Sequence, residues 1–337
     1  MSKGGISVVH WNISRKDQIK IRGIKRYEDE LYNNLRKIGV NVRRIQRTTI
    51  TPLAYFKDYK FTDEDIVHGT TQEIANITLI KHIPRFVLTI HDLAVLNTNK
   101  LFPGFDISHK MQYLFIKKAI QKVNKIVTVS KFWKKEIVRL TDVDENKISI
   151  VYPGINHEVF KPMPDVAKSS FILSFVKVHD VVKIYREFRK KESKKYKLVL
   201  IGEVSPEDMP RIAHRDIIPM GYISDEELSR LYNEAGLLLY PTKYMGFDYP
   251  LFEAMACGCP VITSNMSDVP ELLGDAGLKL DPYDIDAIIK AMHEVLTNEG
   301  LRQEMVKKGF DQVKRYSWER YAKEILKIYE KVYEETK

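Results

Sequence analysis

The chain has 337 residues, a length typical of two domains, and 44% of them are hydrophobic, which excludes a disordered polar chain. Its two cysteines exclude a disulfide scaffold and a four-cysteine zinc site. Its apolar runs fall far short of the ~20 residues of a membrane-spanning helix. The net charge of +9 comes from the first half, because residues 1–160 hold 27 lysines and arginines against 16 acids and the remainder holds 27 against 29. This asymmetry favours an anionic partner for the first half, although a solvated lysine-rich surface is an equally good explanation.

The first half alternates short β-branched runs with longer amphipathic stretches. Its clearest helical pattern covers residues 24–38, where apolar side chains recur on one face until Gly39 ends the helix. Strands that alternate with helices predict βαβ units and a parallel sheet. The expected strands are residues 6–10, 40–44, 66–68, 86–90, 126–129 and 148–152.

The second half repeats this alternation and then ends in helices. Proline and glycine crowd residues 152–164, which marks a linker between the two sets of strands. The expected strands are residues 171–175, 198–201, 217–220, 237–240 and 261–263, and the helices between them are 183–191, 225–234 and 251–255. The C-terminal helices are expected at residues 285–298, 301–313 and 318–333.

These patterns predict an α/β protein made of two Rossmann-like, doubly wound domains that face each other across a cleft. The first domain is expected to cover residues 1–160, and the second to cover residues 161–337 with the C-terminal helices. The last helix can pack back on the first domain. Ligands of such sheets bind beyond the carboxyl ends of the strands, so the cleft is the expected site.

The most informative stretch is residues 246–262, which read GFDYPLFEAMACGCPVI. It follows an expected strand and opens a helix near Pro250, because proline is tolerated in a first helical turn. The amides and the dipole at a helix N-terminus attract anions, so a diphosphate fits there. Glu253, expected in the first turn, can accept hydrogen bonds from the vicinal hydroxyls of a sugar. The alternative is that the helix dipole alone favours an acidic residue at this place.

Gly246, Phe247, Pro250 and residues 253–261 resemble the nucleotide-binding signature of family 4 retaining glycosyltransferases, which have the GT-B fold. The resemblance extends over nearly the whole chain. It implies an enzyme that moves a hexose from a UDP- or GDP-linked donor to a hydroxyl acceptor, on a glycan or a lipid-linked molecule. Further matching segments, in the family's order, are residues 23–27, 89–93, 127–130, 152–156, 221–228, 270–271, 274–277 and 317–318.

The resemblance also implies a role for each matching residue. Glu253 would bind the ribose hydroxyls, His91 would lie near the donor sugar and the leaving phosphate, and Gly23 would let the backbone approach the diphosphate. Lys177 and Lys183 fall near the family's phosphate-binding arginine and lysine, and they would stabilise the leaving group. The other donor-binding residues are Tyr222 and Ile223, whose backbone would hold the base, and the signature residues Gly246, Phe247, Tyr249, Pro250 and Leu251.

Departures from the family pattern bear on activity. Met245 replaces the family's first glutamate, which faces the transferred sugar, and Asp248 replaces a glycine three residues later, from where its carboxylate can act in a shifted position. Lys177 lacks the fork of an arginine, so we expect a weaker phosphate clamp. Two alternatives therefore stay open: a catalytically impaired sugar-nucleotide-binding member or partner subunit, and, less favoured, a nucleotide-sugar epimerase.

The family's mechanism implies retention at the anomeric carbon, with no covalent nucleophile, no metal and no cofactor. Two Asp-x-Asp triplets, residues 142–144 and 284–286, are interpreted as a loop and a helix cap rather than as metal ligands. The Cys257-Gly258-Cys259 triplet is interpreted as structural packing. A dinucleotide oxidoreductase is not favoured, because no Gly-x-Gly-x-x-Gly follows the first strand.

Basic and aromatic residues interleave in residues 110–139, where Phe115, Phe132 and Trp133 lie among eight lysines. Such helices can lie on an anionic membrane surface, which suits a lipid-linked acceptor. A nucleic-acid partner is not expected, because no recognition motif accompanies the charge. The sequence shows no signal-peptide pattern, so the expected location is the cytoplasm, with peripheral attachment to the inner face of the membrane as a hypothesis.

Overall fold

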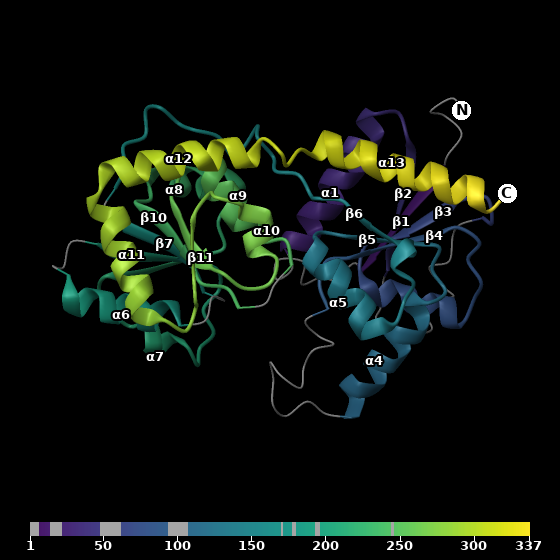
Figure 1. Ribbon diagram of the computed structural model, residues 1–337, viewed down its shortest axis with the longest axis horizontal. Helices are drawn as coiled ribbons and strands as arrows, with labels where there is room; N and C mark the ends of the chain where they lie inside the picture. The colour runs from purple at the N-terminus through teal and green to yellow at the C-terminus, as the bar shows by residue number, and fades with distance from the viewer. Residues whose placement is uncertain are drawn as a thin grey trace. The chain divides into compact units, whose positions relative to one another are not determined.

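The computed structural model describes residues 7–13, 22–47, 62–93, 107–169, 171–176, 180–192, 196–243 and 246–337. The chain divides into two compact units (Figure 1). The first consists of Met1–Gly154 with Ser317–Lys337, and the second of Ile155–Tyr316. The border therefore lies before the predicted one near residue 160. The reason is that Ile155 and Phe160, within the proline- and glycine-rich segment, are buried in the second unit.

The first unit contains, within its described residues, a six-stranded parallel sheet in the order β2-β1-β3-β4-β5-β6. Because β1 lies between β2 and β3, the chain reverses its direction of travel across the sheet at this point. Ligands of doubly wound sheets bind beyond the carboxyl ends of the strands at such a reversal. The strands are β1 (Ser7–Ile13), β2 (Asn41–Arg47), β3 (Ile66–Gly69), β4 (Phe86–Ile90), β5 (Lys125–Thr128) and β6 (Ile148–Ile150).

Helices cover this sheet, and one of them comes from the far end of the sequence. The C-terminal helix α13 (Trp318–Glu335) packs against β4 and against α1 (Arg22–Lys37) (Figure 1). Its buried side chains recur every three or four residues, so a single stripe faces the first unit. The remaining helices are η2 (Gln72–Leu79), α4 (Ile107–Ile120), α5 (Lys131–Thr141) and η4 (Glu145–Lys147).

The second unit contains, within its described residues, another six-stranded parallel sheet, in the order β12-β11-β10-β7-β8-β9. The reversal here lies between β7 and β10. The strands are β7 (Phe171–Phe175), β8 (Lys197–Ile201), β9 (Ile217–Gly221), β10 (Leu237–Tyr240), β11 (Val261–Ser264) and β12 (Leu278–Leu280). The helices are α6 (Val181–Lys191), α7 (Met209–Ile212), α8 (Asp225–Glu234), α9 (Tyr249–Ala256), α10 (Val269–Leu273), α11 (Ile285–Thr297) and α12 (Glu299–Val313).

Two doubly wound α/β units are thus confirmed, and the differences from the predicted elements are local. The short strand β12 and the short helices α7 and α10 were not predicted. Asp284 caps α11 by accepting a hydrogen bond from the Ala287 amide at 2.9 Å, as its triplet predicted. In the residues that the structure describes, no helix is both long enough and apolar enough to span a lipid bilayer.

Candidate functional site

The loops that follow β7 and β10 lie at the reversal of strand order in the second unit. β7 and β10 are neighbours, but the chain continues from β7 to β8 on one side and from β10 to β11 on the other. The Asp180 carboxylate, beyond β7, forms an ion pair of 3.3 Å with the Lys243 ammonium group, beyond β10. Phe175 and Tyr240 end the two strands and meet edge to face, with ring centroids 5.7 Å apart. This end of the sheet is therefore where a ligand is expected.

A cavity of about 1030 Å³ lies beside the carboxyl ends of β7 and β8. Lys183 lines it from the first turn of α6, where its side chain is exposed. Basic and acidic side chains both line the wall, and Lys190 and Arg211 are paired there with Glu187 and Asp208. The basic residues are Lys183, Arg186, Lys190 and Arg211, and the acidic ones are Asp180, Glu187, Glu203 and Asp208.

Helix α9 begins at the same end of the sheet, with Pro250 in its first turn as predicted. Phe247 anchors the preceding loop by stacking on Phe252, with ring centroids 4.4 Å apart and planes within 5° of parallel. The Leu251 amide donates to the Asp248 carbonyl oxygen at 3.1 Å, and the Tyr249 amide donates to the Phe247 carbonyl oxygen at 3.1 Å. Because proline has no N–H, the residues Tyr249–Leu251 offer an anion mainly the field of the helix dipole.

Asp248 is buried immediately before α9 and faces the end of β10. The Tyr240 hydroxyl donates a hydrogen bond of 3.5 Å to its carboxylate. Burial and the nearby Asp248 carboxylate raise the pKa of Tyr240 well above its usual value, so the phenol keeps its proton. The sequence therefore places a carboxylate at the reversal, three residues from the position where the family's first glutamate is replaced by Met245.

Glu253 lies in the second turn of α9, not in the first, because the helix begins at Tyr249. The dipole at the N-terminus acts mainly on the first turn, so it does not account for this glutamate. Its side chain is only 1% exposed, and the Tyr232 hydroxyl of α8 donates to its carboxylate at 3.3 Å. A buried carboxylate of this kind is costly unless hydrogen bonds stabilise it. The hydrogen bond from Tyr232 therefore helps to stabilise the Glu253 carboxylate.

Two further predicted residues follow β9, on the same end of the sheet. Tyr222 is exposed and Ile223 is buried. Lys177, a predicted phosphate-binding residue, and Met245, at the position of the family's first glutamate, lie outside the described residues. Among the described residues, the predicted donor-binding positions of the second unit thus all follow the carboxyl ends of its strands or lie in the helices that come next.

The first unit holds the other two predicted positions. Gly23 is the second residue of α1, which follows β1, and His91 follows β4 directly. His91 is half-buried, and its Nε2 lies 3.2 Å from the carbonyl oxygen of Thr70, beyond β3. The ring of Tyr27, from α1, meets the His91 ring edge to face at 4.5 Å. His91 is therefore held at the carboxyl end of this sheet by α1 and by the segment after β3.

Burial lowers the pKa of His91 to about 4, so the imidazole is neutral near pH 7. A carbonyl oxygen only accepts hydrogen bonds, so the proton of the neutral ring is on Nε2 and Nδ1 carries the lone pair. A neutral ring in this tautomer can accept a hydrogen bond from a hydroxyl, but it brings no positive charge to a phosphate. The chemistry open to His91 is therefore that of a hydrogen-bond acceptor.

A buried polar network in the first unit includes Tyr27, whose ring contacts His91, and no sequence pattern indicates this network. The Thr89 hydroxyl bonds to His68 Nε2 at 2.7 Å and to the Tyr27 hydroxyl at 2.9 Å. The Tyr27 hydroxyl also meets that of Tyr321, at 2.9 Å, and His68 Nδ1 meets the Tyr329 hydroxyl at 2.6 Å. The network joins α1, β3 and β4 to α13. Its members are up to 294 positions apart in sequence, so no local pattern reveals it.

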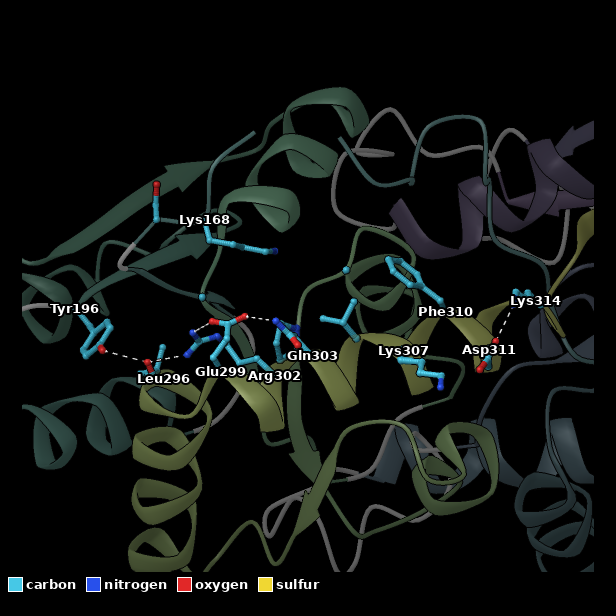
Figure 2. A pocket seen from close by; sticks show the side chains of 15 residues that line it. Lys168, Tyr196, Leu296, Glu299, Arg302, Gln303, Lys307, Phe310, Asp311 and Lys314 are labelled. Carbon is cyan, nitrogen blue, oxygen red and sulfur yellow. Dashed lines mark hydrogen bonds and ion pairs between the residues drawn. The ribbon is translucent and has the colours of Figure 1, made fainter. Parts of the chain in front are cut away.

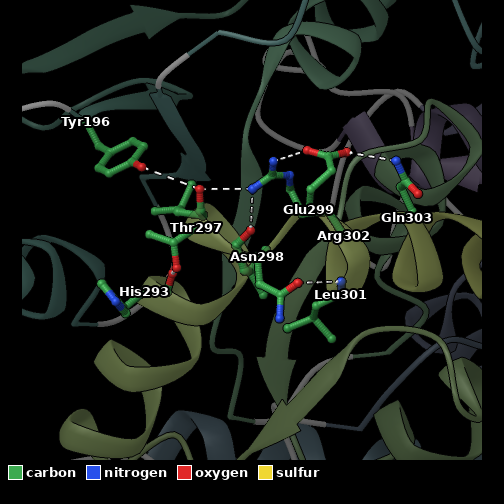
Figure 3. Close-up of polar contacts among 10 residues, drawn as sticks. Tyr196, His293, Thr297, Asn298, Glu299, Leu301, Arg302 and Gln303 are labelled. Carbon is green, nitrogen blue, oxygen red and sulfur yellow. Dashed lines mark hydrogen bonds and ion pairs between the residues drawn. The ribbon is translucent and has the colours of Figure 1, made fainter.

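A second cavity, of about 650 Å³, lies at the opposite, amino end of the strands of the second unit (Figure 2). The Arg302 guanidinium group donates to the carbonyl oxygens of Val295 and Leu296, both at 2.9 Å, and pairs with Glu299 (Figure 3). Lys314 likewise pairs with Asp311 at 2.7 Å. The Arg302 contacts stabilise the corner between α11 and α12, and the Lys314 pair lies at the C-terminal end of α12. Because the cavity lies at the amino end of the strands, it is not the candidate active site.

Two family models match the chain in succession. Residues 24–159 match the model described as Glycosyltransferase Family 4, and residues 174–298 match the model described as Glycosyl transferases group 1. O-antigen chain mannosyltransferase B of Escherichia coli is 28% identical over 296 residues, which cover 81% of this chain and 75% of the relative. The serotype-specific mannosyltransferase WbdA of Escherichia coli is 24% identical over 69% of this chain, but the match covers only 32% of WbdA.

Solved structures resemble both units together. Sucrose-phosphate synthase of Thermosynechococcus elongatus aligns with a TM-score of 0.79 at 16% identity, over 97% of this chain and 99% of that one. HepE of Anabaena, solved in complex with UDP and glucose, aligns with a TM-score of 0.76 at 13% identity, over 96% of this chain and 99% of that one. At such identities the likeness concerns the fold.

Proposed function

The chain belongs to the group 1, family 4 glycosyltransferases, and from that membership we propose that it moves a hexose from a UDP- or GDP-linked donor to a hydroxyl acceptor. The predicted GT-B fold is confirmed. The finer proposal is that transfer proceeds with retention at the anomeric carbon and without a metal ion. Retention and metal independence are proposed from the family resemblance alone. Donor binding by the second unit is supported by one observation: its described donor-binding positions all follow the carboxyl ends of its strands or lie in the next helices.

Each group has a distinct part in the proposed reaction. The bond between the anomeric carbon and the diphosphate oxygen breaks while the acceptor oxygen attacks on the same face, and the hydroxyl proton passes to the leaving phosphate. Lys177, Lys183 and the dipole of α9 stabilise the negative charge that develops on the diphosphate, with backbone near Gly23. Glu253 and Tyr232 bind the ribose, and Asp248 is the carboxylate nearest to the position that Met245 occupies. His91 accepts a hydrogen bond from a hydroxyl group through Nδ1.

The sugar proposed first is mannose. The relatives named above are mannosyltransferases, and the MMP alpha-(1->4)-mannosyltransferase of Mycolicibacterium hassiacum is another, 23% identical over 64% of this chain. The acceptor proposed is a hydroxyl of a growing glycan or of a lipid-linked sugar, because the relatives include an O-antigen chain enzyme. UDP and GDP remain equal candidates for the nucleotide.

Thermal stability with a panel of UDP-, GDP- and ADP-linked sugars and free nucleotides tests the donor. A ligand at about 100 times its Kd adds roughly 2.7 kcal/mol of stability, which is a visible shift in Tm. We expect one nucleotide class to stabilise the wild type and not Glu253→Ala, while the exposed control Glu294→Ala responds as the wild type does. No shift with any nucleotide would contradict the proposal.

Product analysis tests the mechanism. We expect the anomeric configuration of the product, read by proton NMR, to match that of the donor sugar. We also expect the rate to be unchanged after dialysis against EDTA. An inverted product, or a rate that EDTA abolishes and one divalent cation restores, would refute the corresponding half of the mechanism.

Met245 provides the test of the alternative in which the protein binds a sugar nucleotide without transferring the sugar. If the native site is impaired, Met245→Glu raises the transfer rate strongly. If Met245 shapes the pocket of an active enzyme, as we propose, Met245→Glu lowers the rate. An epimerase would instead return the donor with an altered sugar when no acceptor is present, which chromatography of the nucleotide sugar detects.

We also propose that α4 contacts an anionic membrane surface. Leu114 and Phe115 are 48% and 47% exposed on α4, next to the lysines 117, 118 and 122. Trp133, one of the interleaved aromatic residues, is buried in the core and is not available to a membrane. Vesicles with and without phosphatidylserine test the proposal by co-sedimentation. We expect binding only to the anionic vesicles, and its loss in the Leu114→Ser/Phe115→Ser variant; equal binding to neutral vesicles would rule the proposal out.

A further inference from the structure

We propose that Glu28 is a positioning residue for His91 and acts through Thr70. The Thr70 hydroxyl donates a hydrogen bond of 2.5 Å to the Glu28 carboxylate, and the Thr70 carbonyl oxygen accepts from His91 Nε2 at 3.2 Å. Thr70 is fully buried and Glu28 is 8% exposed. The inference rests on the proposed function, because it assigns His91 a part in transfer. It adds a residue of α1 that no motif singled out.

The hydrogen bond between the Thr70 hydroxyl and the Glu28 carboxylate is a strong one. A hydroxyl that donates to a carboxylate forms a charge-assisted bond, and burial strengthens it because the effective dielectric is low. The backbone of Glu28 is itself held, since the Arg44 guanidinium group donates to its carbonyl oxygen at 3.1 Å. The side chain of Thr70 is thereby fixed to α1. The carbonyl oxygen of the same residue, which faces His91, is fixed with it.

The adjacent residue of α1 restrains His91 from a second side. Tyr27 places its ring edge to face against the imidazole at 4.5 Å, and its hydroxyl is held by Thr89 and Tyr321. Tyr27 thus limits the position of the ring, whereas Thr70 limits its rotation and its tautomer. Together they keep the proton on Nε2, directed at the Thr70 carbonyl oxygen, and leave Nδ1 of His91 as the acceptor. A hydrogen bond of this sort is a common way of fixing a functional imidazole.

Substitution at Thr70 separates this role from a merely structural one. Thr70→Val keeps the shape of the side chain and removes its hydroxyl, and Thr70→Ser restores the hydroxyl. Thr78→Val is the matched control, because Thr78 is also buried in the first unit and its hydroxyl donates to the Ala119 carbonyl oxygen at 3.0 Å. We expect similar losses of Tm in the two valine variants. Only Thr70→Val should lower kcat, by about tenfold or more, with the KM of donor and acceptor within about twofold.

The partner residue gives an independent comparison. Glu28→Gln keeps an oxygen that can accept from Thr70, whereas Glu28→Leu does not. We expect the glutamine variant to retain most of the wild-type kcat and the leucine variant to behave as Thr70→Val does. A kcat that falls equally in Thr78→Val and Thr70→Val, or in neither, would overturn the proposal.

The tautomer of His91 can be read without any activity. Nitrogen-15 NMR of the imidazole should show the proton on Nε2 in the wild type and in Thr70→Ser, and a mixture of tautomers in Thr70→Val and Glu28→Leu. An unchanged tautomer in the last two variants would overturn the positioning role. The His91→Ala variant tests the proposed function separately. Full activity in this variant would remove His91 from the mechanism. If Thr70→Val and Glu28→Leu still showed the expected NMR changes, the positioning of His91 by Thr70 and Glu28 would stand.

Discussion

The Asp180 carboxylate and the Lys243 ammonium group lie 3.3 Å apart and join the two loops at which the strand order of the second unit reverses. Asp180 stands immediately before α6, in the left-handed region with φ of 63°, and Lys243 stands a few residues before α9. Each of these helices carries residues predicted to bind the donor. The pair therefore links the two loops that precede these helices.

Loss of this pair should affect donor binding more than stability. Both side chains are partly exposed, and such pairs contribute at most about 1 kcal/mol. We expect Lys243→Met to lower the free energy of unfolding by less than that and to raise the donor KM severalfold. Lys308→Met, which breaks an exposed pair with Glu304 on α12, is the control and should leave KM unchanged. An equal KM in the two variants would argue against the role of the pair.

The titration of His91 should make stability fall in acid. Its pKa is lowered to about 4 in the folded protein, from 6.5 in the unfolded chain. Between these pH values the unfolded chain binds a proton at His91 that the folded protein does not. The free energy of unfolding is therefore unaffected by the titration of His91 above pH 6.5, and it decreases as the pH drops to about 4. The loss is at most about 3 kcal/mol. Urea unfolding at pH 5 and pH 7.5 should show a smaller loss for His91→Gln than for the wild type; equal losses would count against the low pKa.

The two cysteines should resist alkylation in the folded protein. Burial raises the pKa of Cys257 and of Cys259 to about 12, so at pH 8 only on the order of one thiol in ten thousand is a thiolate, which is the reactive form. Mass spectrometry after treatment with iodoacetamide should find neither modified until urea is added. Lys290→Cys, on the exposed face of α11, is the positive control. Rapid modification of the native wild type would contradict the packing role.

The contact between Tyr329 and His68 should matter for stability. Tyr329→Phe removes the hydroxyl that lies 2.6 Å from His68 Nδ1 in the core of the first unit, and we expect a loss of about 1–3 kcal/mol. Tyr333→Phe is the control on the same helix, because the contact of its ring with Arg85 at 4.8 Å does not use the hydroxyl. Urea unfolding of the two variants measures the difference. Equal stabilities would mean that the network does not support α13.

The sequence was sufficient for the alternation of strands and helices and for the signature at α9, because both are local patterns. It was not sufficient where a residue's neighbours are distant in sequence. β12 was missed because it is short and only half-buried at each position, so it has neither an alternating nor a fully apolar pattern. The prediction that the last helix can pack back on the first domain is confirmed for α13, although its residues were counted with the second domain because an amphipathic stripe does not identify the partner that covers it.

The residues of the candidate site likewise fall into those that local motifs predict and those that only the fold brings together. His91, Asp248 and Glu253 were found from motifs, although Glu253 was placed one turn too early because Tyr249, rather than a later residue, begins the helix. Glu28 and Thr70 could not be found, since one lies within a helix and the other just after a strand, 42 positions away. Only the paired strands and the helix above them bring the two side chains together.

The membership of α13 in the first unit also has a consequence for biosynthesis. The second unit is one continuous segment, Ile155–Tyr316, whereas the first needs Ser317–Lys337 to be complete. During synthesis, Tyr27 and His68 are translated well before Tyr321 and Tyr329, so the contacts between them form only after Ile155–Tyr316 has been made. Until then, the surface of α1 and β4 that α13 covers in the folded first unit stays open to other contacts.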